Sequence, residues 1–351
     1  MGGGYSLGLV YDNIISVENL LEAWREFIRG KRKRTDVQEF GRHLMQNILA
    51  LHRDLVANTY RHSGYHHFKI ADQKPRDIHK ASVRDRLVHH ALYRVFYPFF
   101  DRLFVSDSYS CRLGKGTHRA MNRFRAFAYK VSRNNTRTCW VLKCDVRKFF
   151  ASIDHTILMR ILHTRISDER TTALFGNIIA SFHSTALSTG LPLGNLTSQL
   201  LVNIYLNEFD QFIKHTLKAK YYIRYADDFI ILSADYARLI SLLSRIQDFL
   251  RINLKLKLHP RKVSISTLAS GVDFLGWVHF PDHRMLRAST KRRMFRALSG
   301  NPRKETVLSY RGMLTHGNTC KLSKRIAIND THIQAYKEWC FVIEWEYTKH
   351  G

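Results

Sequence analysis

The chain has 351 residues, and its 45% hydrophobic and 12% aromatic content is typical of a folded globular protein with a sizeable core. Its 56 lysines and arginines against 29 aspartates and glutamates give a formal net charge of +27. This excess runs along the whole sequence, so it favours a polyanionic partner over an anionic membrane surface or a merely soluble basic protein.

Cysteine usage and the lengths of the apolar runs indicate the cellular compartment. The five cysteines are odd in number and show no C-x-x-C spacing, which suits a reducing cytoplasm. No apolar run reaches the roughly 18 residues that a membrane span needs, and the first residues lack the order of a secretory signal. We therefore expect a cytoplasmic protein that works without a membrane.

Hydrophobic spacing predicts a mixture of helices and strands. The first predicted elements are helices over 17–60 around a basic break at 31–34, an extended segment at 65–79, a helix over 83–99 and a basic loop at 110–116 before another helix. They are followed by a buried strand at 139–145, a helix capped by residues 152–154 and a turn at 190–195 that opens a long helix. The last are a strand-turn-strand unit within 221–235, a helix over about 237–252, a strand around 272–280 and a basic helical tail from 289. This order predicts an α+β fold, not an alternating parallel one.

Two adjacent aspartates, Asp227 and Asp228, interrupt the hydrophobic strand-turn-strand unit. Burying two carboxylates side by side costs several kcal/mol through desolvation and mutual repulsion unless a cation is present. The alternating flanks predict that the pair lies at the tip of a hairpin. A divalent metal is the expected cation.

A third carboxylate, Asp145, ends the buried strand that precedes this hairpin in the sequence. If the two strands are neighbours in one antiparallel sheet, their carboxylates meet and offer oxygen ligands to two Mg²⁺ ions, with Mn²⁺ as a substitute. That geometry suits nucleotidyl transfer. Taken alone, Asp145 is equally well explained as an ordinary turn residue at the end of a strand.

Three motifs in order resemble motifs A, B and C of reverse transcriptases. They are Asp145-x-x-x-x-Phe150, Gly190-x-Pro192-x-Gly194-x-x-x-Ser198 and Tyr225-Ala226-Asp227-Asp228. The resemblance covers about residues 15–280. It implies a right-hand polymerase with an antiparallel palm sheet flanked by helices: N-terminal helices and fingers at 1–110, a palm at 111–284 with a fingers segment at about 151–190, and a helical thumb at 285–351.

The second motif departs from the group II intron pattern. Where that pattern has Gln-Gly-x-x-x-Ser-Pro, this chain has Leu193-Gly194-x-x-x-Ser198-Gln199, which resembles diversity-generating retroelement reverse transcriptases. That resemblance implies copying of a template-repeat RNA into error-prone, adenine-mutagenised cDNA, as in mutagenic retrohoming. It also implies template RNA, a cDNA or primer strand and deoxynucleoside triphosphates as ligands, and a small basic accessory protein that forms a pentameric ring.

The resemblance further implies roles for individual residues. Asp145, Asp227 and Asp228 with the main-chain carbonyl of Val146 would form the metal site, and Lys262 would donate a proton to pyrophosphate. The nucleotide would be bound by Arg76, Lys69, Phe150 as a steric gate, Leu193, Gly194 and Gln199. Nucleic acid would be bound by Arg84, Arg86, Lys115, Lys291, Arg292, Arg293 and Arg296.

Plainer roles remain open for several of these residues. Phe150 could be a core phenylalanine beside Phe149, Lys262 a solvated lysine, and Leu193 a side chain that only packs the turn. The basic residues from Lys291 on could form a solvated helix face.

Other protein classes also stay open at this point. An intron or phage-defence reverse transcriptase would share the chemistry, and neighbouring genes would separate it from the retroelement type. A non-catalytic RNA-binding scaffold would not need Asp145, Asp227 and Asp228, and a metal-dependent nuclease would not need Arg76 or Phe150.

Overall fold

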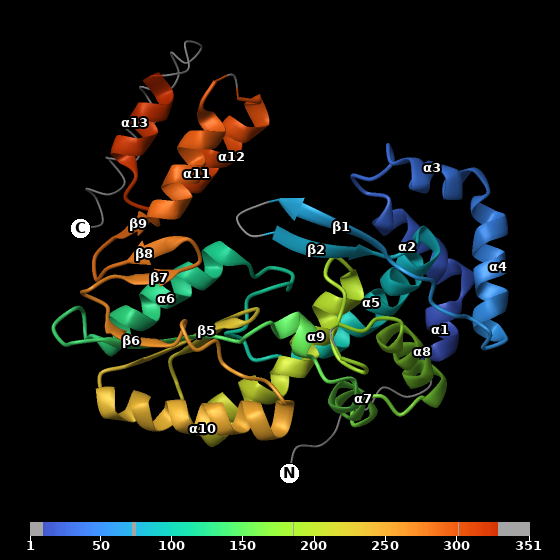
Figure 1. Ribbon diagram of the computed structural model, residues 1–351, viewed down its shortest axis with the longest axis horizontal. Helices are drawn as coiled ribbons and strands as arrows, with labels where there is room; N and C mark the ends of the chain where they lie inside the picture. Colours follow the sequence, from blue (N-terminus) through green and yellow to red (C-terminus); the bar gives the residue numbers. More distant parts are fainter. Residues whose placement is uncertain (1–9, 72–74, 185, 301, 329–351) are drawn as a thin grey trace. The chain divides into compact units, whose positions relative to one another are not determined.

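A computed structural model describes residues 10–71, 75–184, 186–300 and 302–328 of the chain (Figure 1). The chain forms two compact units. The first comprises the residues up to Gly116 with Lys143–Ile231 and Ala237–Ser264, and the second comprises Thr117–Leu142, Leu232–Tyr236 and the residues from Ile265 onward. Helices and antiparallel strand pairs follow each other in the predicted α+β order.

The N-terminal part of the first unit is helical because its apolar residues recur every three or four positions. Ser16 and Ser82 each cap a helix by accepting a hydrogen bond from a backbone N–H three residues later. Leu20, Phe27 and Leu87 are buried where α2 packs against α5. These helices are α1 (Tyr11–Ile15), α2 (Val17–Phe27), α3 (Thr35–Arg42), α4 (Leu44–Val56) and α5 (Val83–Leu103).

The segment predicted to be extended forms a hairpin in the first unit. Its strands, β1 (His66–Ala71) and β2 (Pro75–Lys80), pair antiparallel, with Lys69 opposite Asp77 and Ile70 opposite Arg76. The extended prediction for 65–79 is therefore confirmed.

A four-stranded sheet carries the aspartates. Its strand order is β4 (Tyr222–Tyr225), β5 (Asp228–Ser233), β3 (Trp140–Asp145) and β6 (Ser264–Thr267). Strand β3 lies between β5 and β6, and Val141, Leu142 and Cys144 are fully buried in it. A strand whose residues are mostly apolar and buried is expected in the interior of a sheet.

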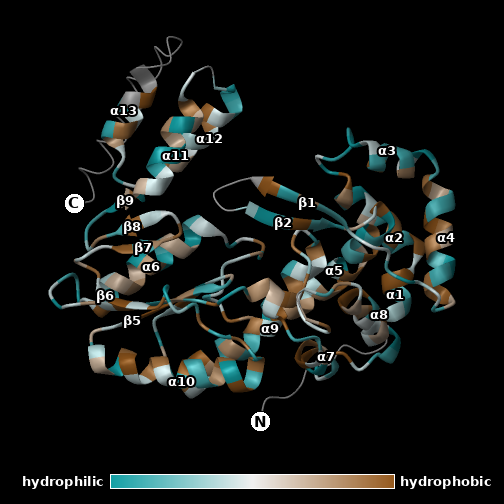
Figure 2. Cartoon of the chain, viewed as in Figure 1, coloured by the Kyte–Doolittle hydropathy of each residue, from teal (hydrophilic) through white to brown (hydrophobic). Residues whose placement is uncertain are grey.

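Helices of the first unit pack around these strands. Helix α9 is buried on nearly every side, and Phe209 on it contacts Phe229 of β5 with ring centroids 5.0 Å apart. In contrast, α10 carries both hydrophilic and hydrophobic residues along its length (Figure 2). The remaining helical elements of this unit are η1 (Phe149–Ser152), α7 (His155–His163), α8 (Glu169–Ala180), α9 (Leu196–Gln211), η2 (Phe212–Thr216) and α10 (Tyr236–Leu254).

The second unit has its own hydrophobic cluster. Trp277, Leu286, Met294 and Leu314 are among its buried members, and they come from strands and helices alike. Its elements are α6 (Thr117–Val131), β7 (Val272–Phe274), β8 (Trp277–His279), β9 (Arg284–Leu286), α11 (Ala288–Leu298), α12 (Lys304–Leu314) and α13 (Cys320–Ile328).

The prediction of a single strand around 272–280 is wrong. Phe274 pairs with Trp277 across a two-residue turn, so β7 and β8 form a hairpin. Both turn residues, Leu275 and Gly276, have positive φ angles, of 53° and 87°. Positive φ at both positions is typical of a tight type I′ hairpin turn, and the apolar Leu275 concealed this turn in the sequence.

No helix in the described part of the chain is long and apolar enough to cross a membrane.

Candidate active site

The aspartate pair lies at the tight turn between β4 and β5, as predicted. Tyr225 pairs with Asp228, which leaves Ala226 and Asp227 as the two connecting residues. Ala226 has φ +54°, a left-handed conformation that costs a residue with a side chain roughly 1–2 kcal/mol. Buried residues such as Ile230 flank the turn, so the pair projects from a rigid hydrophobic base.

Asp145 meets this turn because β3 and β5 are neighbours in the sheet. Asp145 ends β3 where Asp228 begins β5, and the backbone N–H of Val146 donates to the carbonyl of Asp227 at 3.2 Å. The two strands therefore run antiparallel. The structure thus brings Asp145 together with the aspartate pair that begins 82 positions later in the sequence.

The carboxylates perturb one another. Burial and the charge of Asp145 raise the pKa of Asp227, while Lys262 and Arg76 act in the opposite direction. Burial, the charge of Asp227 and a hydrogen bond with the Asp145 carboxyl raise the pKa of Asp228 to about 6. The cluster thus holds more negative charge than its surroundings neutralise, a pattern typical of functional sites.

Lys262 contributes a positive charge directly. Its Nζ donates to Asp145 Oδ2 at 2.5 Å, and the Asp145 side chain is only 9% exposed. The preceding segment runs beside the end of β3, where the His259 N–H donates to the Asp145 carbonyl at 2.8 Å. Lys262 is therefore part of the site and not simply a solvated lysine.

The donors around Asp145 and Asp227 fit a hard divalent cation. They are carboxylate oxygens, the ligand type that Mg²⁺ prefers, and it usually takes one or two carboxylates together with substrate phosphates. Among the described residues, no group of three or more His, Cys, Asp or Glu side chains is arranged so that it could hold a metal ion by itself. A site shared with substrate phosphates does not require such a cage.

The raised pKa of Asp228 predicts how stability depends on pH without added metal. A carboxyl whose pKa is about 6 when folded and about 3.9 when unfolded opposes folding above pH 6, and this effect disappears as pH falls towards 4. We expect Asp228→Asn to raise the free energy of unfolding by about 1–3 kcal/mol at pH 8 and by much less at pH 4.5. Urea unfolding in EDTA at both pH values measures this. An equal gain at both pH values would contradict the assignment.

The turn of the second motif is attached to strand β2. The His79 N–H donates to the Leu193 carbonyl at 3.1 Å, and Asn195 Nδ2 donates to the His79 carbonyl at 2.9 Å. A Cβ on Gly194, whose φ is +105°, would lie 2.9 Å from Ile78 Cγ2. Leu193 itself is half-buried at this contact. The strand that carries Arg76 is thus hydrogen-bonded to, and packed against, the predicted nucleotide-binding turn.

Arg76 and Lys69 do not share a face of their hairpin. Ile70 is opposite Arg76 and Lys69 is opposite Asp77. Since opposite residues share a face and successive residues alternate, Lys69 points away from the face of Arg76. Ile78 shares the Arg76 face, so that face is the one against Gly194.

Phe149 and Phe150 differ in environment. Phe149 is 2% exposed and belongs to the core, whereas Phe150 is half-buried, with the ring centroids 5.7 Å apart. The Leu191 N–H donates to the Phe150 carbonyl at 2.8 Å. The main chain of Phe150 is therefore attached to the same turn as Leu193.

Three predicted nucleic-acid-binding residues are engaged within the protein. Arg84 pairs with Asp54 at 2.6 Å, Arg86 pairs with Asp36 at 2.6 Å, and Lys115 donates to the Ser106 carbonyl at 2.7 Å.

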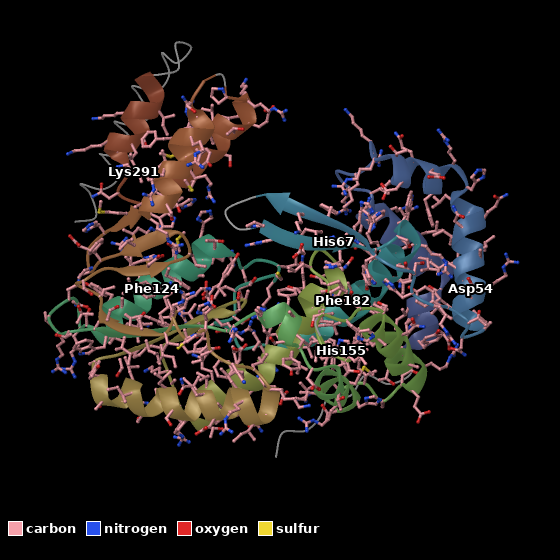
Figure 3. The ribbon with its side chains drawn as sticks, in the orientation of Figure 1. Asp54, His67, Phe124, His155, Phe182 and Lys291 are labelled. Carbon is pink, nitrogen blue, oxygen red and sulfur yellow. The ribbon has the colours of Figure 1, made fainter. Side chains whose placement is uncertain are left out.

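The remaining predicted contacts are at the surface. Lys291, Arg292 and Arg296 are exposed on α11, Arg293 is half-buried there, and Met294 turns into the hydrophobic cluster. Figure 3 shows Lys291 on this helix. The amphipathic pattern of α11 leaves its lysine and arginines available to a ligand. Gln199 is also exposed, on α9.

The sequence analysis did not single out Arg224 and Asp210, which are 1% and 0% exposed. A single arginine in the apolar run Tyr221–Leu232 was the available signal, since a buried charge needs a partner. Its partner, 14 residues earlier on α9, could not be identified from spacing.

Comparison with known proteins agrees with this geometry. The profile of the family described as reverse transcriptase (RNA-dependent DNA polymerase) matches residues 69–279. Protein YkfC of Escherichia coli (strain K12) is 28% identical over 269 residues, which cover 66% of this chain and 68% of YkfC. Group II intron-encoded protein LtrA of Lactococcus lactis subsp. cremoris is 25% identical over 160 residues, which cover 44% of this chain and 25% of LtrA.

A solved structure, apo telomerase from Candida tropicalis truncated from the C-terminal domain, aligns with a TM-score of 0.49 and 12% identity over 70% of this chain and 60% of that one. The family profile covers more than half of the chain, including Arg76, the three aspartates and Lys262. The α+β, right-hand polymerase fold expected from the sequence is that of this family. The chain belongs to the reverse transcriptase family.

Proposed function

We propose that the chain copies an RNA template into DNA from deoxynucleoside triphosphates with two Mg²⁺ ions, for which Mn²⁺ can substitute. The observation that carries this proposal is the convergence of Asp145, Asp227 and Asp228 at one end of the sheet. Arg76 lies close enough for its charge to oppose the rise that burial and Asp145 cause in the pKa of Asp227. A carboxylate cluster with a nearby guanidinium suits both the metals and the triphosphate of one nucleotide.

Each residue has a defined task in this reaction. The carboxylates of Asp145 and Asp227 and the carbonyl of Val146 would hold the metals, and Asp228 would support them. Metals held there would lower the pKa of the primer 3′-hydroxyl and offset the charge of the leaving pyrophosphate. Arg76 binds the triphosphate through its planar guanidinium. Lys262, already within the site, donates a proton to the leaving group.

The remaining assignments extend the proposal to the whole chain. Residues 1–110 and about 151–190 act as fingers, 111–284 as palm and 285–351 as thumb, although 1–9, 72–74, 185, 301 and 329–351 lie outside the described residues. Lys291, Arg292, Arg293 and Arg296 bind the phosphate backbone of the template–primer duplex. Such binding weakens with salt and is largely indifferent to sequence.

Primer extension tests the activity. The purified chain is incubated with an RNA template, a DNA primer, deoxynucleotides and Mg²⁺, with and without a candidate accessory protein, and the products are sequenced. Full-length DNA that requires Mg²⁺ supports the proposal. If wild-type protein binds the duplex but makes no DNA under any of these conditions, the proposal is wrong and the chain is a non-catalytic RNA-binding scaffold.

We further propose the diversity-generating subclass. Its support is the Leu193-Gly194-x-x-x-Ser198-Gln199 pattern, with Leu193 half-buried beside His79. The substrate is then a template-repeat RNA, the product is adenine-mutagenised cDNA, and the partner is a pentameric basic accessory protein.

Leu193→Gln tests the basis of the mutagenesis. Leucine discriminates nucleotides by shape alone, whereas glutamine adds a hydrogen-bonding group near the nascent pair. We expect misincorporation opposite template adenines to fall by about tenfold, with little change opposite other bases. Product sequencing measures both rates. An unchanged adenine error rate would mean that Leu193 only packs the turn.

Phe150→Val tests the steric gate. Phe150 is half-buried while Phe149 is in the core, so its ring is available to exclude a ribose 2′-hydroxyl. We expect selection for deoxynucleotides over ribonucleotides to fall by up to about 100-fold while deoxynucleotide incorporation continues. Single-nucleotide insertion kinetics with paired dNTP and rNTP give the ratio. Retained selectivity in a folded variant would assign Phe150 to packing.

An intron-type reverse transcriptase is the second candidate, since LtrA is named as a group II intron-encoded protein. The match covers only 25% of LtrA, so most of that protein has no counterpart in it. Products with a uniform error spectrum would favour this candidate, and errors confined to template adenines would favour the retroelement type.

A further inference from the structure

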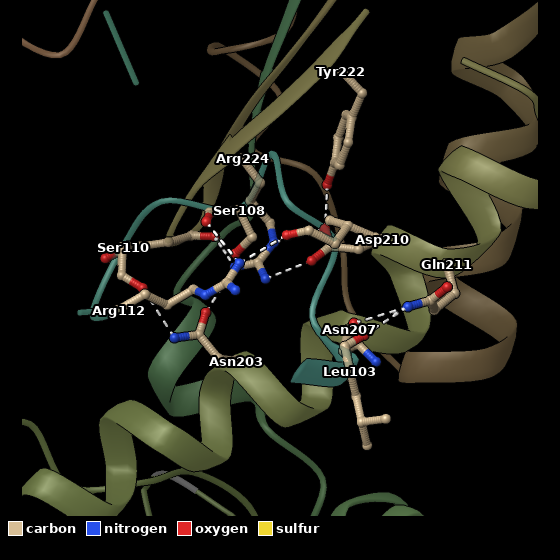
Figure 4. Close-up of polar contacts among 12 residues, drawn as sticks. Leu103, Ser108, Ser110, Arg112, Asn203, Asn207, Asp210, Gln211, Tyr222 and Arg224 are labelled. Atoms are coloured by element: carbon tan, nitrogen blue, oxygen red, sulfur yellow. Dashed lines mark hydrogen bonds and ion pairs between the residues drawn. The ribbon is translucent and has the colours of Figure 1, made fainter. Parts of the chain in front are cut away.

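Arg224 and Asp210 form a fully buried ion pair (Figure 4). Arg224 lies on β4, the strand that leads into the aspartate turn. Arg224 on β4 donates from Nε to Asp210 Oδ1 at 2.8 Å and from Nη2 to Asp210 Oδ2 at 2.6 Å. The two side chains are 1% and 0% exposed. This two-bond arrangement fixes the plane and the rotation of the guanidinium.

Stability alone is a weak explanation for such a pair. Removing two charges from water is costly, and a hydrophobic pair of similar volume is often equally stable or more so. Although burial disfavours its charge, Asp210 raises the pKa of Arg224 above the ordinary value, so the guanidinium stays charged. The pair therefore stays ionised, and the N–H groups of Arg224 that are not bonded to Asp210 have fixed directions.

The remaining nitrogen of Arg224 reaches the turn. Its Nη1 donates to the carbonyl of Ala226 at 3.2 Å and to Asn203 Oδ1 at 3.2 Å. Ala226 holds the left-handed φ of +54°, and its carbonyl belongs to the peptide group that leads directly into Asp227. A bond to this carbonyl fixes the peptide plane that orients Asp227.

The surrounding contacts keep Arg224 in place. Its backbone N–H donates to the Asp107 carbonyl at 3.0 Å, and its carbonyl accepts from the Tyr109 N–H at 2.9 Å. Asn203 in turn donates from Nδ2 to the Ser110 carbonyl at 3.0 Å. Arg224 thus connects β4, the loop after α5 and the middle of α9, the helix that begins directly after the Leu193–Asn195 turn.

We propose that Arg224 is a positioning residue for Asp227: held by Asp210, it fixes the Ala226 carbonyl and thereby the direction of the metal-binding carboxylate. It also couples that carboxylate to α9 and hence to the nucleotide-binding turn. This inference rests on the proposed function, since Asp227 binds metal there.

Two variants of the full chain test the role. Arg224→Lys keeps a positive charge beside Asp210 but loses the planar fork that reaches Ala226. Arg224→Met with Asp210→Leu replaces the pair by apolar side chains, and because it leaves the buried Tyr222 hydroxyl and Asn203 Oδ1 without these partners, we expect a folded protein with a lower melting temperature. In both we expect kcat for primer extension to fall about 10–100-fold with KM for dNTP changed less than about threefold, and the Kd for Mn²⁺, measured by EPR, to rise about tenfold.

Tyr222→Phe is the matched control. The Tyr222 hydroxyl donates to Asp210 Oδ1 at 2.5 Å but has no bond to the turn. We expect a lower melting temperature with kcat and the Mn²⁺ Kd unchanged within about twofold, because both Arg224–Asp210 bonds remain.

Unchanged kcat and Mn²⁺ affinity in either folded Arg224 variant would overturn the proposal, as would a Tyr222→Phe variant that loses kcat to the same extent. If Arg224→Lys does not fold, the double variant decides. If the wild-type chain makes no DNA, the proposed function fails, and the Mn²⁺ affinities still decide the role of Arg224.

Discussion

Asp227→Asn is expected to abolish DNA synthesis while leaving the protein folded. Asparagine keeps the size of the side chain but removes the charge that binds divalent metal. Losing roughly 4 kcal/mol of transition-state stabilisation lowers the rate by about 10³-fold. Because burial and Asp145 raise the pKa of Asp227, removing its charge should leave the melting temperature equal or higher. Primer extension and thermal unfolding, run on the same preparation, measure both.

Asp248→Asn provides the matched control. It is the same chemical change on α10, where Asp248 is 58% exposed and pairs with Arg251. We expect wild-type activity and stability, because exposed pairs contribute little. If Asp227→Asn retains more than about a tenth of the wild-type rate of DNA synthesis, the assignment of Asp227 to the metal site is wrong.

Gly194→Ala is expected to lower the stability of the protein more than the same change at a glycine with open space around it. Gly194 has φ +105°, and a Cβ there would lie 2.9 Å from Ile78 Cγ2. Backbone strain of roughly 1–2 kcal/mol adds to overpacking of roughly 1–3 kcal/mol, so we expect the free energy of unfolding to fall by about 2–4 kcal/mol. Urea denaturation measures the change.

Gly116→Ala separates the two causes. Gly116 has a matching φ of +103° with nothing within 4 Å of a Cβ, so it reports backbone strain alone. Adding Ile78→Ala to Gly194→Ala should restore the part of the free energy of unfolding by which Gly194→Ala falls below Gly116→Ala. Equal losses at Gly194 and Gly116 would show that the turn does not press against β2.

The sequence predicted the elements of the site well because they are local. Alternation in Tyr221–Leu232 predicts a hairpin, and an acidic pair at its tip marks the turn. The prediction failed at 272–280, where Leu275 adopts a left-handed conformation that usually calls for glycine or asparagine. An apolar residue in that position carries no turn signal.

Side-chain partners were not predictable from one sequence. Arg84 and Arg86 looked available for nucleic acid, but helix packing brings Asp54 and Asp36 to them. Lys69 and Arg76 looked like companions until the hairpin register put them on opposite faces. Neither outcome depends on local periodicity, since each is fixed by segments distant in the chain.

By itself, the sequence determined the α+β order, the acidic turn and the motifs of a reverse transcriptase, because periodicity and residue type are properties of short segments. Only the tertiary structure decided that Asp145 meets Asp227, that Lys262 pairs with Asp145, and that Asp210 holds Arg224 on the strand that leads into the turn. These contacts join residues 14 to 117 positions apart. Sheet order and helix packing, which minimise buried unpaired charge and exposed apolar surface, determine which of them meet.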